Sequence, residues 1–188
     1  HSFPTRRSSD LVENINENPE QSAKNVWVPN RNGLFLNIAG AYAEGENYDY
    51  IIIDNNPDVG ILFNMSMVAS DFVIIPTFAD NNAIEGIYET QNVLNKLTNG
   101  KLKVSNAKVL GYILSMREAS TNMHTVALER LSTIANNHPD KPFVKWVSKG
   151  VKIQETSIYQ EPISYRERGS IQAREFYSIA KEIEKRSK

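Results

Sequence analysis

The chain has 188 residues, of which 40% are hydrophobic and 23% charged, and it contains no cysteine. This length and hydrophobic content suit one domain with one buried core and argue against intrinsic disorder. A chain without cysteine has no disulfide, thiolate zinc site, iron–sulfur cluster or thiol nucleophile. The lack of cysteine leads us to expect a cytoplasmic protein. The longest uncharged stretch, Val59 to Ser70, is too short to cross a bilayer, so we expect no membrane-spanning helix.

The net charge of −1 hides an asymmetry along the chain. Residues 12–100 carry 3 basic and 12 acidic side chains, whereas residues 141–188 carry 11 basic and 6 acidic ones. The basic surplus near the C-terminus indicates an anionic partner for that part of the molecule, although a solvated basic helix gives the same pattern.

The first residues do not read as folded protein. His1 to Leu11 follow neither helical nor strand periodicity, lack an initiator Met and resemble the in-frame translation of a sequencing-library adapter. We therefore predict that residues 1–11 are a non-native scar and that the native chain was cut upstream of Val12.

The predicted elements alternate between strands and helices. Tyr48 to Ile53 ends in three consecutive Ile before Asp54, which is typical of a parallel strand buried on both faces. The later elements, in chain order, are a short helix over 61–69, a strand over 72–75 halted by Pro76, a helix from Asn82 to Asn99, a strand over 109–114, a helix over 122–137, short strands over 143–147 and 151–153, and a last helix capped by Ser170 with Ala173, Phe176, Tyr177, Ala180 and Ile183 as its buried stripe.

This order predicts an α/β fold with a mostly parallel sheet and helices on both faces. Ligands in such folds bind at the carboxyl ends of the strands. Asp54 leaves a predicted buried strand at that edge, where nucleotide phosphates and Mg²⁺ bind, and it is the first candidate site residue. An alternative is that Asp54 only caps the following turn through its own backbone.

Several longer patterns occur together. YDYIIIDNNPDVG is followed by ASDFVIIP, AIEGI, VLGYILSMREASTN and VKIQETSIYQEPISYRERGSIQAREFYSIAKEI. As a set, over about residues 48–188, they resemble the ParA family of partition ATPases, the Soj and MinD branch of P-loop NTPases. The resemblance implies that residues 12–188 form a partial nucleotide-binding domain that lacks its N-terminal Walker A strand, loop and helix.

The resemblance also assigns roles to individual residues. Asp54 matches the Walker B aspartate, which holds Mg²⁺ through water, and ATP and Mg²⁺ are the implied cofactors. Pro57 matches the second Pro of the family's Thr-Pro-Pro, while Asn55 and Asn56 replace the Thr and the first Pro. Met116 and Arg117 match the loop beside the nucleotide base, with the alternative that Met116 fills a gap in the core.

No GxxxxGK[ST] phosphate-binding loop occurs in the sequence. Family spacing places that loop upstream of this chain, so we expect the chain as given not to hydrolyse ATP, whereas its full-length parent would.

In the partition branch, ATP-bound homodimers bind DNA without sequence preference and associate with the nucleoid. The resemblance implies phosphate contacts by basic residues near the C-terminus and a ParB-like centromere-binding partner. The candidate contacts, each of which could instead be an ordinary solvated charge, are Lys145, Lys149, Lys152, Arg166, Arg168 and Arg174.

Two other functions remain open. Asn55 and Asn56 are compatible with a degenerate, non-hydrolysing ParA-like adaptor. A MinD-like regulator of the cell-division site would need a membrane-binding amphipathic helix at the chain end, and the tail EIEKRSK, with Ile183 as its last apolar residue, argues against one.

Overall fold

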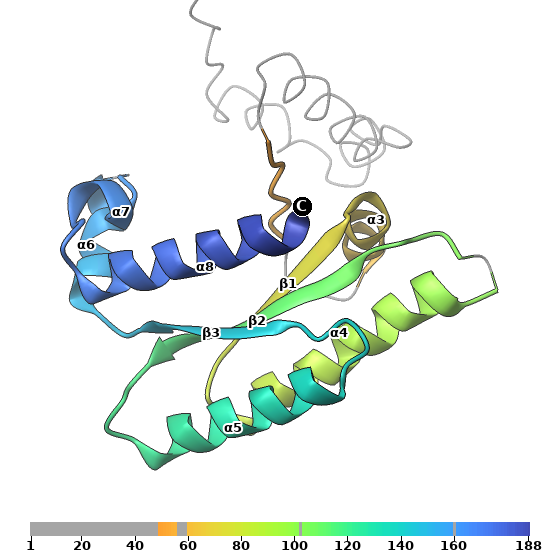
Figure 1. Ribbon diagram of the computed structural model, residues 1–188, viewed down its shortest axis with the longest axis horizontal. Coiled ribbons are helices and arrows are strands. Elements are labelled where there is room, and N and C mark those ends of the chain that lie inside the picture. Colours follow the sequence, from red (N-terminus) through yellow and green to blue (C-terminus); the bar gives the residue numbers. More distant parts are fainter. Residues whose placement is uncertain (1–48, 56–59, 102, 160) are drawn as a thin grey trace, which may run out of the picture. The chain divides into compact units, whose positions relative to one another are not determined.

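The computed structural model describes residues 49–55, 60–101, 103–159 and 161–188. It divides the chain into two compact units, His1–Asp54 and Asn55–Lys188. The helices and strands of the second unit, in chain order, are α3 (Ile61–Ala69), β1 (Phe72–Thr77), α4 (Asn81–Asn99), β2 (Lys108–Arg117), α5 (Asn122–Asn137), β3 (Phe143–Ser148), α6 (Val151–Tyr159), α7 (Ile163–Arg166) and α8 (Ile171–Ser187) (Figure 1).

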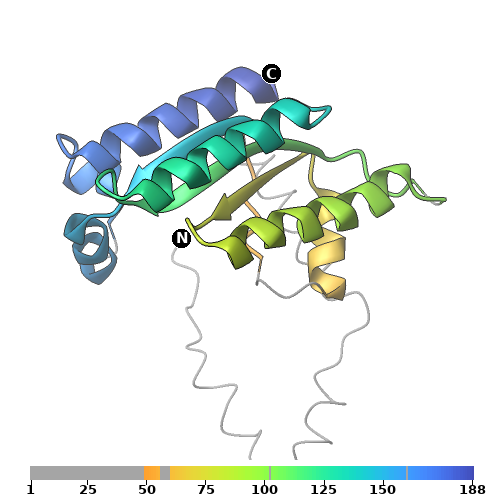
Figure 2. The same cartoon turned by 90° about the horizontal axis from the view of Figure 1, so that it is seen from below.

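The three described strands form one parallel sheet in the order β1-β2-β3. Figures 1 and 2 show α4 and α5 on one face of this sheet and α8 on the other. The predicted α/β class, with a parallel sheet and helices on both faces, is therefore confirmed for the second unit. Because parallel strands end at the same edge, the loops after Thr77, Arg117 and Ser148 lie along one edge of the sheet.

Each face of the sheet has its own hydrophobic core. The larger core joins α3, α4 and α5 to the sheet through residues such as Met67, Ile87 and Leu131. The smaller core lies under α8 and contains Leu110, Phe143, Val147 and Ile179. Burying both faces explains why the strand sequences are apolar runs rather than alternating patterns.

An irregularity in β2 decides which residues enter each core. Val73 pairs with Val109, but the next residue, Ile74, pairs with Gly111, so Leu110 is an extra residue on β2. Such a bulge resets the alternation of side chains along a strand. Val109 and Tyr112, which are three residues apart, consequently both pack into the larger core, whereas Leu110 packs into the smaller one.

The helix boundaries follow from their caps. The side chain of Asp80 accepts a hydrogen bond from the Ala83 N–H at 2.7 Å and begins α4. Gly100 ends the same helix by donating its N–H to the Lys96 carbonyl. Ser170 caps α8 in the same way through the N–H of Ala173, as predicted.

The predicted stripe of α8 is wrong in part. Ala173 is buried and Ile183 half-buried, but Phe176, Tyr177 and Ala180 are exposed, and Ile179 occupies the core instead. The reason is that the Glu175 carboxylate binds the end of β3, which turns this side of α8 toward the sheet.

Two predicted strands are also wrong. Residues 151–153 begin helix α6, because the inward positions are three apart: Ile153 is half-buried, Thr156 is buried, and the Thr156 hydroxyl donates to the Ile153 carbonyl at 2.8 Å. Residues 49–55 form no strand, and Ile52 is 90% exposed. A continuous apolar run forms a stable strand only where both of its faces are covered, which is not the case for these residues.

Within the described residues, the longest helices are too polar for a membrane-spanning segment.

Candidate functional site

The carboxyl edge of the sheet is held together by contacts between the ends of β2 and β3. The N–H of Lys149 donates to the Arg117 carbonyl at 3.0 Å, and the Arg117 guanidinium lies over the Trp146 ring, 4.7 Å from its centroid. Trp146 Nε1 in turn donates to the Glu175 carboxylate at 3.1 Å, which also accepts from the Ser148 hydroxyl at 2.6 Å. These contacts fix both strand ends against α8.

Met116 has an unusual backbone conformation at this edge. Its φ of 54° lies in the left-handed region, which costs a residue with a Cβ free energy. Its side chain is 58% exposed, which rules out the alternative that it fills a gap in the core. Backbone strain of this kind is concentrated at ligand sites, and an exposed thioether is free to contact a ligand.

The loop after β2 is ordered by its own hydrogen bonds. The Glu118 N–H donates to His124 Nδ1 at 2.6 Å, and the Thr121 hydroxyl donates to the Glu118 carbonyl at 3.0 Å. Lys149 Nζ donates to Glu118 Oε1 at 2.6 Å, and this hydrogen bond, with the lysine charge, lowers the pKa of Glu118. The loop and the start of the β3–α6 connection are thereby linked.

The predicted metal and phosphate residues are only partly described. Asp54 closes the first unit and Asn55 opens the second, and both are exposed. Asn56 and Pro57 lie outside the described residues. An exposed carboxylate has the chemistry that Mg²⁺ prefers, so Asp54 fits a water-mediated site. Over the described ranges, no three His, Asp or Glu side chains gather in a cluster that would hold a metal directly.

Three of the six predicted DNA contacts are already paired with carboxylates. Lys149 pairs with Glu118, Lys152 with Glu167 at 2.6 Å, and Arg166 with Glu161 at 3.0 Å. These pairs lie at the corner formed by the end of β3, α6 and α7. A phosphate would have to replace a carboxylate at each of them.

The other three candidates have different surroundings. Lys145 Nζ donates to the Ser178 hydroxyl at 2.9 Å, and the Arg168 guanidinium lies 5.4 Å from the Tyr165 ring centroid. Arg174 is exposed on α8 and forms no ion pair with the described part of the chain. Sequence reasoning missed Lys181, whose Nζ lies 4.7 Å from the Tyr177 ring centroid; their spacing of four residues in a helix was the available signal.

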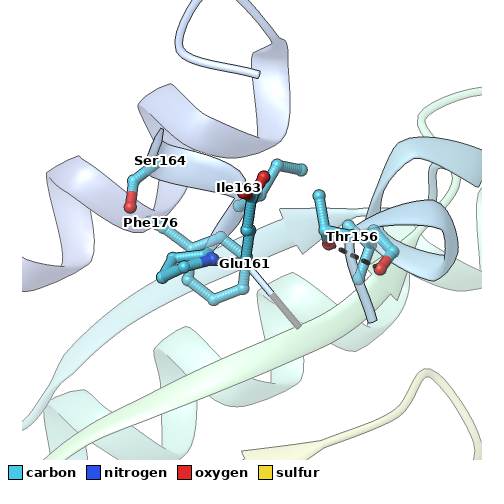
Figure 3. Close-up of a pocket in the computed structure, with 7 residues that line it drawn as sticks. Thr156, Glu161, Ile163, Ser164 and Phe176 are labelled. Atoms are coloured by element: carbon cyan, nitrogen blue, oxygen red, sulfur yellow. Dashed lines mark hydrogen bonds between the residues drawn. The ribbon is translucent and has the colours of Figure 1, made fainter. Parts of the chain in front are cut away.

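Nothing in the sequence indicated a groove between α6, α7 and α8. It is an open pocket of about 460 Å³ (Figure 3). Its lining residues are Ile153, Thr156, Glu161, Pro162, Ile163, Ser164 and Phe176. We refer to these seven residues as the C-terminal groove.

Comparison with protein-family models gives two matches. An AAA domain model matches residues 41–109, and the model of queuosine biosynthesis protein QueC matches residues 2–58. The QueC match covers residues 2–54 of the first unit, His1–Asp54, and overlaps the AAA match over residues 41–58. This second similarity was not anticipated from the sequence, and the predicted scar and single partial domain stay predictions.

Curated relatives of both kinds are found. The Bacillus subtilis sporulation initiation inhibitor protein Soj is 30% identical over 138 residues, which are 73% of this chain and 53% of Soj. An uncharacterized Mycobacterium tuberculosis protein, Rv1708, is 26% identical over 182 residues, covering 94% of this chain and 54% of the relative. The 7-cyano-7-deazaguanine synthase of Methanosarcina mazei is 55% identical over 49 residues, covering 23% of this chain and 21% of that enzyme.

Among solved structures, a plasmid partition protein from Borrelia burgdorferi covers 64% of this chain and 48% of its own, with 23% identity and a TM-score of 0.43. The chain spans about half the length of Soj and of the mycobacterial relative. The Soj and AAA domain matches confirm the resemblance found in the sequence motifs: this chain is a relative of the ParA/Soj-type P-loop ATPases.

Proposed function

We propose that the chain is the C-terminal portion of a ParA-family ATPase that partitions chromosomes or plasmids through ATP-dependent dimerisation and nonspecific DNA binding. The similarity to Soj over 73% of the chain carries this proposal. It is supported by a parallel sheet whose carboxyl edge presents a strained, exposed Met116 beside a rigidly held Arg117.

The nucleotide would be ATP with Mg²⁺ in the full-length parent. Asp54 would hold the hydration shell of the metal, which bridges the phosphates and neutralises their charge. The segment Asn55–Pro57 would lie beside the phosphates, in the place of the family's Thr-Pro-Pro. Met116 would contact the base from its exposed position, and Arg117 would position that loop through its contact with Trp146.

The DNA-binding surface would centre on the basic residues that have no carboxylate partner. Lys145, Arg168 and Arg174 are available for phosphate contacts in this sense. Lys149, Lys152 and Arg166 would contribute only by exchanging a carboxylate for a phosphate. A ParB-like protein would be the partner that stimulates hydrolysis, and the ATP-bound homodimer would be located on the nucleoid.

DNA binding can be measured on the full-length parent with ATP, Mg²⁺ and random-sequence duplex DNA, by fluorescence anisotropy between about 50 and about 200 mM salt. The double variant Arg168→Gln/Arg174→Gln should bind more weakly and lower the salt slope by about two. The control Lys108→Gln, exposed at the opposite edge of the sheet, should leave both unchanged. Equal affinity and slope in the double variant and the parent would refute this surface.

The non-hydrolysing adaptor is the second candidate, because Asn55 and Asn56 stand where the family has Thr and Pro. An adaptor would bind DNA without hydrolysing ATP. A MinD-like regulator would sediment with anionic lipid vesicles, which requires a bulky apolar face at the chain end, whereas Ile183 is the last apolar residue of α8.

A further inference from the structure

We infer that the C-terminal groove docks a short acidic, amphipathic segment of a partner protein, with a large apolar side chain of that segment inserted between α6, α7 and α8. This inference goes beyond the proposed ATPase function and uses none of its nucleotide residues, but it shares Arg168 and Arg174 with the proposed DNA-binding surface.

The interior of the groove suits an apolar group. Ile163 is buried at its base and Phe176, 41% exposed, forms one wall (Figure 3). Two of the three polar side chains that line the groove already have partners: the Thr156 hydroxyl donates to the Ile153 carbonyl, and the Glu161 carboxylate accepts from Arg166. A polar ligand would therefore find few free groups here, whereas an apolar side chain would gain from leaving water.

The surroundings of the groove are also apolar. Ile158 on α6 is 79% exposed, and Tyr159 and Tyr165 are exposed as well. The Arg166 guanidinium lies over the Tyr159 ring, 3.5 Å from its centroid, and the Arg168 guanidinium lies near the Tyr165 ring. Tyrosine and arginine around a central apolar pocket are the composition of protein–protein interfaces.

The charge of this region selects an acidic partner. Three carboxylates already form ion pairs with a neighbouring cation, namely those of Glu118, Glu161 and Glu167. Arg168 and Lys181 form no ion pair with any described residue, and neither does Arg174. Glu155 on α6 is exposed and also forms no ion pair with a described residue, but the unpaired charge on α6, α7 and α8 is still mainly positive, and the segment 141–188 carries 11 basic and 6 acidic side chains. Complementarity therefore favours carboxylates around the apolar anchor.

A nucleic acid accounts for these features less well. Phosphates would use the free cations, but a sugar–phosphate backbone has no group that fills an apolar cavity of about 460 Å³. An amphipathic helix that places large apolar side chains one turn apart fills such grooves and leaves its polar face at the rim.

The probe for the test is a fluorescein-labelled helical peptide with Phe and Leu four residues apart and Glu and Gln elsewhere. Its binding to the complete 188-residue chain is measured by fluorescence anisotropy. Phe176→Glu places a charge in the groove wall, and Ser164→Trp fills the groove from an exposed position. Tyr177→Ala is the matched control, because Tyr177 is the exposed neighbour of Phe176 on α8 and does not line the groove.

We expect saturable binding that both groove variants weaken by about tenfold or more and that Tyr177→Ala changes by less than about twofold. A peptide with Lys in place of Glu should bind more weakly. Circular dichroism establishes that each variant is folded. Three results would overturn the inference: no saturable binding, equal binding by the Lys peptide, or no effect of Ser164→Trp. Direct binding of labelled duplex DNA that Ser164→Trp abolishes would assign the groove to nucleic acid and overturn the inference as well.

Discussion

Gly111 is the position where adding one carbon atom should disturb the fold most directly. It lies in the middle of β2 and faces Phe143 on the neighbouring strand. A Cβ built on Gly111 would lie 2.4 Å from two carbons of the Phe143 ring and 2.6 Å from a third. Phe143 is itself buried in the core under α8, so its ring has little space into which it can move.

The cost follows from this overlap. An ordinary carbon contact begins at 3.4 Å, so the ring or the strand has to move by about 1 Å. Overpacking of this kind typically costs about 1–3 kcal/mol, and the central position of β2 favours the upper half of that range. For a chain of this size, we expect Gly111→Ala to lower the melting temperature by about 5–10 °C.

Gly86→Ala is the matched control, because a Cβ added to Gly86 on helix α4 would have no neighbouring atom within 4 Å. Alanine is the better helix former, so this variant should gain about 0.5–1 kcal/mol. Urea unfolding followed by circular dichroism measures both changes. Combining Gly111→Ala with Phe143→Leu should cost less than the sum of the two single changes. The reasoning fails if Gly111→Ala is as stable as the parent chain or if the double variant is additive.

Three further predictions concern the backbone, a cap and a charge. Met116→Gly should be about 1 kcal/mol more stable than Met116→Ala in urea unfolding, because glycine accepts the left-handed φ without strain. Asp80→Ala should cost about 1 kcal/mol by removing the cap of α4, and Asp80→Asn should restore most of it. The ion pair of Glu118 with Lys149 should stabilise the fold fully at pH values above the unfolded-state pKa of the Glu118 carboxyl. This stabilisation should be lost as the pH falls through the lowered folded-state pKa. NMR titration should therefore give a higher pKa for Glu118 in Lys149→Gln than in the parent chain.

Much of the fold of the second unit could be predicted from the sequence. Apolar runs closed by turn residues identified β1, β2 and β3, and spacings of three and four identified α4 and α5. Their alternation was sufficient for a parallel sheet with helices on both faces, because local pattern and chain order limit the topology strongly.

The errors arose where tertiary contacts overrule a local pattern. The sequence Tyr48–Ile53 has the pattern of a buried strand, but burial depends on partners that no local pattern specifies. Glu175, a polar residue without a distinctive motif, fixes the face that α8 turns to the sheet. The C-terminal groove arises from three helices together, so no single stretch of sequence could have predicted it.

The candidate site was predicted less completely than the fold. The position of Met116 and Arg117 at the carboxyl edge followed from the parallel sheet, whereas the positive φ of Met116 and the stacking of Arg117 on Trp146 depend on the register of β2 and β3. Basic residues near the C-terminus could be counted, but their ion pairs with Glu118, Glu161 and Glu167 became visible only in three dimensions.

The central claim, that Asp54 serves the metal site of a partition ATPase, is tested most directly by ATP hydrolysis in the full-length parent with Mg²⁺ and duplex DNA. We predict DNA-stimulated turnover that Asp54→Ala abolishes and that Asp71→Ala, an exposed carboxylate before β1, leaves intact. Equal turnover in the parent and in Asp54→Ala would contradict the account.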